Sequence, residues 1–108
     1  MKTAVYPILM LALVACSNLP RPQNVSEGIL FANASLESAY TLVADLRDAG
    51  TISQSAAIEH RDRLDVARAL VDDATALYRA DRENEAGSML ERALVITRAV
   101  TQVLEGRQ

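Results

Sequence analysis

The chain of 108 residues contains few of the residue types that build catalytic or disulfide-stabilised domains. It has one cysteine, one histidine and no tryptophan. A single cysteine excludes an intrachain disulfide, so side-chain packing must stabilise the folded part. All three prolines lie before residue 23, and only four glycines occur, so the rest of the sequence permits long helices. The length is sufficient for one small domain.

Lysine is also nearly absent, since Lys2 is the only one. Without residues 1–15 the chain has 10 arginines and 14 carboxylates, a net charge of 10 − 14 = −4. This balance provides no basic stripe for a phosphate backbone, so we expect no nucleic-acid partner.

The first fifteen residues have the pattern of a secretion signal. Lys2 supplies the positive charge, and an apolar run follows from Ile8 to Val14. A membrane-spanning helix needs about 20 apolar residues, so this run is too short to remain as an anchor. We therefore predict a signal peptide over residues 1–15.

Leu13-Val14-Ala15-Cys16 resembles the lipobox of bacterial lipoprotein precursors. The resemblance implies cleavage before Cys16, transfer of diacylglycerol to its thiol, and acylation of the new α-amine with a chain such as palmitate. Two or three acyl chains would anchor the protein firmly, whereas one chain anchors only marginally. The alternative is an ordinary signal peptide that ends near a cysteine by chance.

Ser17 follows the lipobox cysteine where an aspartate would retain a Gram-negative lipoprotein in the inner membrane. The resemblance therefore implies an outer-membrane protein in the cell envelope that faces the periplasm. Residues 16–24 contain Pro20 and Pro22 and show no helical pattern. We interpret them as a tether that reaches about 25 Å when extended.

Residues 25–108 have helical periodicity throughout and should form the folded domain. We predict helices over about 25–49, 54–80 and 82–105, with Asn24, Ser53 and Asp81 as N-caps and Gly50 after the first helix. The predicted core positions are Ile29, Ala32, Leu36, Ala39, Val43 and Leu46; then Ala57, His60, Leu64, Ala67, Val71, Ala74 and Tyr78; then Ala86, Met89, Ala93, Ile96, Val100 and Val103. Leu70, Leu77, Leu90 and Leu104 widen the last two stripes.

These features predict an all-α fold, an up-down-up antiparallel three-helix bundle after the signal peptide and tether. Seven of the predicted core positions are alanines, which permit close helix approach but bury little area each. We expect modest stability, and self-association or a protein partner that supplies further burial.

The polar residues of the second predicted helix are the remaining candidates for chemistry. His60 is a candidate ligand, base or pH switch, but we favour a histidine at the core edge that is hydrogen-bonded or solvated. Asp72 and Asp73 point about 100° apart on a helix and cannot act as a pair. Glu59–Arg63, Arg61–Asp65, Asp65–Arg68 and Arg68–Asp72 have ion-pair spacing and indicate a solvated face, with a docking surface as the alternative. Tyr40 and Tyr78 should lie at the core edge with their hydroxyls in water.

No nucleophile–base pair, metal cluster or phosphate loop is present in the sequence, so we predict a non-enzymatic protein without a cofactor. The preferred function is a structural or protein-interaction module at the outer membrane. The alternative is a binding protein for a small hydrophobic ligand, which alanine-rich seams disfavour because closely packed helices leave no cavity.

The segment Asp48-Ala49-Gly50-Thr51-Ile52-Ser53 between two helices resembles the turn of small phage- and prophage-type helical lipoproteins. That resemblance covers Ala49 to about Val103 and implies an envelope role during infection, as a lysis accessory or in superinfection exclusion. It implies no catalytic residues.

Overall fold

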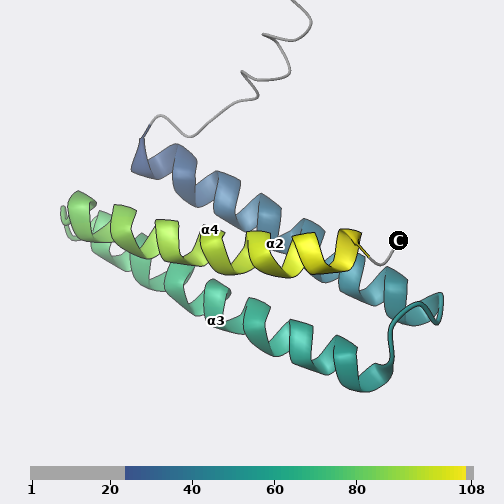
Figure 1. Ribbon diagram of the computed structural model, residues 1–108. Coiled ribbons are helices and arrows are strands. Elements are labelled where there is room, and N and C mark those ends of the chain that lie inside the picture. Colours follow the sequence, from purple (N-terminus) through teal and green to yellow (C-terminus); the bar gives the residue numbers. More distant parts are fainter. Residues whose placement is uncertain (1–23, 107–108) are drawn as a thin grey trace, which may run out of the picture.

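The computed structural model describes residues 24–106, and these form three α-helices that pack against one another. The helices are α2 (Val25–Asp48), α3 (Gln54–Arg79) and α4 (Glu83–Glu105), each within two residues of the predicted bounds. No β-strand occurs between residues 24 and 106, so the predicted all-α class is confirmed. In Figure 1, α4 lies along both of the other helices.

Two of the predicted N-caps are confirmed by hydrogen bonds. The side chain of Asn24 accepts a hydrogen bond from the Glu27 amide at 2.8 Å, and the Ser53 hydroxyl accepts one from the Ala56 amide at 3.0 Å. Each bond satisfies an amide that the first turn of a helix leaves unpaired. Asparagine and serine therefore define where α2 and α3 begin.

The predicted cap of α4 is wrong. Asp81 has a φ of 61°, in the left-handed region, and the N-cap is Arg82, which makes no side-chain cap bond. Asp81 instead ends α3, because its left-handed backbone lets the Arg82 amide donate to the Leu77 carbonyl at 2.9 Å. Gly50, with a φ of 74°, has the same role after α2. Aspartate tolerates this conformation better than most residues, and it explains how α3 ends without a glycine.

The buried residues follow the predicted stripes on α2 and α3 closely. Five of the six predicted core positions of α2 are buried, and six of the seven of α3; Ile29 and Tyr78 are half-buried. The largest fully buried side chains are Val43, Leu64, Val71, Val100 and Leu104. Alanines occupy seven of the sixteen buried apolar positions, so large side chains are few in this core.

On α4 the predicted stripe is rotated by one residue over half its length. Leu90, Thr97 and Leu104 are buried, whereas the predicted Met89 and Ile96 are half-buried and Val103 is exposed. The apolar residues of this helix cover a wide arc, so periodicity alone does not locate the centre of the arc. Contacts with the other two helices select that centre.

Candidate functional site

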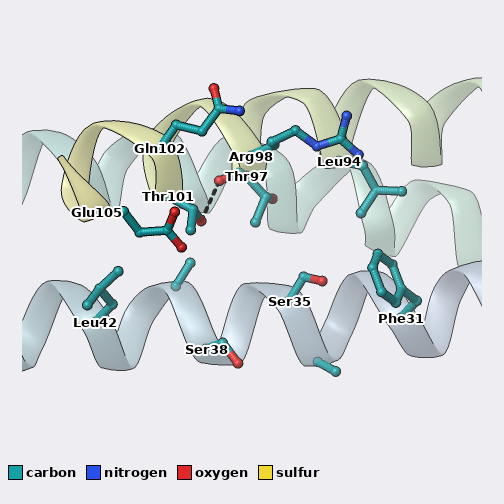
Figure 2. A pocket seen from close by; sticks show the side chains of 12 residues that line it. Phe31, Ser35, Ser38, Leu42, Leu94, Thr97, Arg98, Thr101, Gln102 and Glu105 are labelled. Atoms are coloured by element: carbon teal, nitrogen blue, oxygen red, sulfur yellow. Dashed lines mark hydrogen bonds between the residues drawn. The ribbon is translucent and has the colours of Figure 1, made fainter. Parts of the chain in front are cut away.

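A groove with a volume of about 690 Å³ lies between α2 and α4. Figure 2 shows side chains from the two helices lying on either side of it. Its walls combine small, apolar and charged side chains. The lining residues are Phe31, Ala34, Ser35, Ser38, Ala39 and Leu42 from α2, and Leu94, Thr97, Arg98, Thr101, Gln102 and Glu105 from α4.

The groove exists because α2 presents small side chains to α4. Ala34, Ser35 and Ser38 fill little of the space between the helices, and α4 packs more extensively against α3 than against α2. The groove is an open surface feature, so the expectation that closely packed, alanine-rich seams leave no internal cavity stays a prediction. Closely packed alanines occupy the core, and the groove lies at the surface beside it.

Apolar side chains give the groove part of its wall, together with hydroxyls that are already hydrogen-bonded. Phe31 is 43% exposed, and Leu42 and Leu94 are half-buried. The hydroxyls of Thr97 and Thr101 each donate to the carbonyl four residues earlier, at 2.8 Å (the Thr101 bond is dashed in Figure 2). The proton of each hydroxyl is therefore engaged in a hydrogen bond to the backbone. The groove therefore suits contact with an apolar surface better than nucleophilic chemistry.

Two charges of opposite sign line the groove on α4. Arg98 and Glu105 are seven residues apart, which places them on one face of the helix, about 10 Å apart along its axis. Neither side chain forms an ion pair within residues 24–106, where the ion pairs are Arg47–Asp48, Glu59–Arg63 and Arg82–Glu85. Both charges are therefore available to an occupant of the groove.

A second cluster lies between α2 and α3 and lines another groove of about 680 Å³, and its polar groups contact one another. The Tyr40 hydroxyl donates to Asp65 Oδ1 at 2.5 Å, and the Arg68 guanidinium carbon lies 6.0 Å from the centre of the Tyr40 ring. Burial, together with the hydrogen bond and negative charge of Asp65, raises the pKa of Tyr40 to about 12, and nearby Arg68 opposes part of this rise. These contacts join the two helices.

The raised Tyr40 pKa predicts a distinct alkaline titration. Because the folded pKa of about 12 exceeds the ordinary value of 10.0, the stabilisation is complete below pH 10 and is lost as the pH rises towards 12. Absorbance of tyrosinate should show one late-titrating tyrosine in the folded protein, and Tyr40→Phe should remove that step alone. Loss of the late step in Tyr78→Phe instead would contradict the assignment.

The charged face predicted on α3 is only partly a set of ion pairs. Glu59 and Arg63 pair at 3.1 Å as predicted. Asp65 and Arg68 do not pair with each other, because Asp65 binds the Tyr40 hydroxyl and Arg68 lies over the Tyr40 ring. Tyr40 is half-buried at the core edge, as predicted, and its hydroxyl also has a protein partner. Sequence spacing within α3 could not predict this partner, because α2 brings the phenol to Asp65. Asp72 and Asp73 are both exposed.

His60 is more deeply buried than a hydrogen-bonded or solvated edge residue. It is 8% exposed, and its Nδ1 atom is buried without a hydrogen-bond partner. A buried polar atom without a partner costs stability. Thr97 is the buried polar residue that the sequence analysis missed, and its bond to the Ala93 carbonyl explains how it is accommodated.

A third surface, on the outer side of α3 and α4, is shallow and apolar. Val66 and Val95, 56% and 64% exposed, flank a hollow of about 320 Å³ with Ile96, Ala99 and Val100. Arg63 is the one charged residue that lines it. Arg63 is already paired with Glu59, so this hollow provides mainly apolar contact area.

The predicted lipidation residue Cys16 and sorting residue Ser17 lie outside the described residues, as do the signal peptide and most of the tether. Within residues 24–106, no group of histidine and acidic side chains could hold a metal ion. None of the three described helices is long and apolar enough to cross a membrane. Comparison with protein families, curated proteins and solved structures finds no match to this chain.

Proposed function

We propose that this chain is a lipoprotein anchored through Cys16 in the outer membrane, where its helical domain serves as a non-catalytic protein-interaction module. The anchor is supported by the signal pattern of residues 1–15 and the lipobox that ends at Cys16. Ser17 supports the outer membrane as its destination, with the domain in the periplasm.

We further propose that the bundle runs up-down-up. Phe31 to Leu42 on α2 and Leu94 to Glu105 on α4 occur in the same order along the groove in Figure 2, as two parallel helices require. Turns of a few residues join each helix to the next, which favours antiparallel neighbours.

The α2–α4 groove is the observation that carries the proposed function. It combines exposed apolar area, small side chains that permit close approach, and two charges that form no ion pair within residues 24–106. Grooves of this kind accept an amphipathic helix, whose apolar face covers the wall while its polar residues meet the charged edge. A helix in the groove would also supply the burial that an alanine-rich core provides only sparingly.

Site-specific photo-cross-linking in cells tests this function on the full chain. A benzophenone amino acid in place of Phe31, inside the groove, should give a discrete protein adduct. The same substitution at Leu30, the adjacent residue, which is 69% exposed and does not line the groove, is the matched control. We expect at least a fivefold stronger adduct from position 31, and equal or absent adducts would refute a protein-binding groove.

A small hydrophobic ligand is the second candidate occupant. The volume of about 690 Å³ lies within the range of about 300–1,000 Å³ for small-molecule sites, and Arg98 could bind an anionic group of the ligand. Saturable displacement of an apolar dye from the protein, lost in Phe31→Asp but not in Leu30→Asp, would favour this candidate.

An envelope role in phage infection is the biological context that we propose, either as a lysis accessory or in exclusion of a second phage. It rests on the resemblance of residues 49–103 to small phage-type lipoproteins. A holin or endolysin gene beside the coding sequence would support the lysis role, and a secretion or pilus operon would exclude it.

A further inference from the structure

We propose that the occupant of the α2–α4 groove is α4 of a second copy of this chain, in antiparallel orientation. The inference rests on the proposed function of the groove and names its partner. It follows from the sign and spacing of the two groove charges that have no internal partner, Arg98 and Glu105.

The two charges are self-complementary across a two-fold axis. A two-fold axis perpendicular to α4 that passes beside the helix, level with a point between Thr101 and Gln102, is equally far along the helix from Arg98 and Glu105, because each lies about three and a half residues away. It therefore places Arg98 opposite the partner's Glu105, and Glu105 opposite the partner's Arg98. One symmetric contact thus forms both ion pairs, as expected of an isologous interface.

The alternative orientation is disfavoured by the same charges. If the two α4 helices ran parallel about an axis along their length, Arg98 would face the partner's Arg98 and Glu105 would face the partner's Glu105. Like charges across an interface cost several kcal/mol and suppress that arrangement. The charge pattern therefore selects the antiparallel pair.

The shape and apolar content of the groove also fit a helix. Helix axes approach to about 8–10 Å, and the closer distances need small side chains at the contact. Ala34, Ser35 and Ser38 provide such a surface on α2. Apolar area on Leu42, which lies near Glu105 in Figure 2, would be covered by the second helix, and this adds burial to the two ion pairs.

Disulfide cross-linking of the full chain in isolated membranes tests the position of the axis. Gln102→Cys adds a thiol next to the proposed axis, where two copies bring their residues 102 together, whereas Val95→Cys adds one at an exposed position outside the groove. The parent chain, whose one cysteine is Cys16, measures the background. Under mild oxidation we expect at least fivefold more covalent dimer from Gln102→Cys than from Val95→Cys.

Charge exchange on the Gln102→Cys background then tests the ion pairs. Arg98→Glu and Glu105→Arg should each lower the yield of covalent dimer at least fivefold, because each creates two like-charge contacts. The double variant Arg98→Glu/Glu105→Arg restores both pairs with reversed polarity and should recover most of the yield. Helix content by circular dichroism should be equal in all variants, since these positions make no internal ion pair.

The outcomes separate this inference from the function on which it rests. Equal dimer yields from Gln102→Cys and Val95→Cys, or a double variant no better than the single ones, would overturn self-association. A position-31 photo-adduct with the mass of a different protein would also overturn it, yet would leave the groove as a protein-binding site. Absence of any position-31 adduct together with equal dimer yields would refute both.

Discussion

Replacement of Cys16 by serine should abolish lipid labelling and release the protein from the membrane fraction. The serine hydroxyl is a far poorer nucleophile than a thiolate and does not accept diacylglycerol, so no acyl chain is attached. Each buried methylene contributes about 0.8 kcal/mol to membrane binding, so loss of two or three chains removes nearly all of the affinity. None of the described helices is long and apolar enough to replace that anchor.

Metabolic labelling with palmitate and fractionation of cells that express the full chain would measure this effect. Ser17→Asp is the matched control, because it leaves the acylated cysteine in place and should change the destination from the outer to the inner membrane. Labelling should therefore persist in Ser17→Asp and disappear in Cys16→Ser. If Cys16→Ser remained in the membrane fraction to the same extent as the parent chain, lipidation would not be the anchor.

Leu64→Ala should have the largest effect on stability, a loss of about 2–5 kcal/mol in the free energy of unfolding. Leu64 is 0% exposed and is among the few large side chains in a core where seven of sixteen buried apolar residues are alanines. Alanine neighbours have no flexible side chain that could move into the space, so most of the cavity should persist. Small domains have only about 5–15 kcal/mol of net stability, and this variant should lose a large part of it.

Urea unfolding followed by circular dichroism would measure the loss. Leu30→Ala removes the same atoms from a side chain that is 69% exposed and should change the free energy of unfolding by no more than about 0.5 kcal/mol. A large gap between the two unfolding midpoints is the expected result. Equal midpoints would show that Leu64 is not part of a packed core.

The bounds of the helices were predictable because the residues that begin and end them interact with near neighbours in the sequence. Asn24 and Ser53 begin their helices through bonds to amides three residues later, and Gly50 ends α2 through its own backbone. These interactions span a few residues and can be recognised in sequence. Asp81 was assigned to the wrong helix because aspartate serves both as an N-cap and as a residue with positive φ.

The rotation of α4 was not predictable from its own residues. Its apolar arc is wide enough that stripes through Met89 or through Leu90 describe it equally well, and only Leu90 is buried. The contacts of Tyr40 show that spacing within one helix also fails to predict which residues of two helices meet. Asp65 has arginines at ion-pair spacing in α3, but it binds a phenol that lies 25 residues earlier in the chain.

The sequence by itself determined the class of fold, the bounds of the helices and the lipobox prediction at Cys16, because each depends on residues within a few positions of one another. Tertiary structure alone decided which face of α4 is buried, that His60 Nδ1 has no partner, and that a groove opens between α2 and α4 with Arg98 and Glu105 on its wall. These features depend on how three helices share one core, and side-chain volumes on different helices set that arrangement jointly.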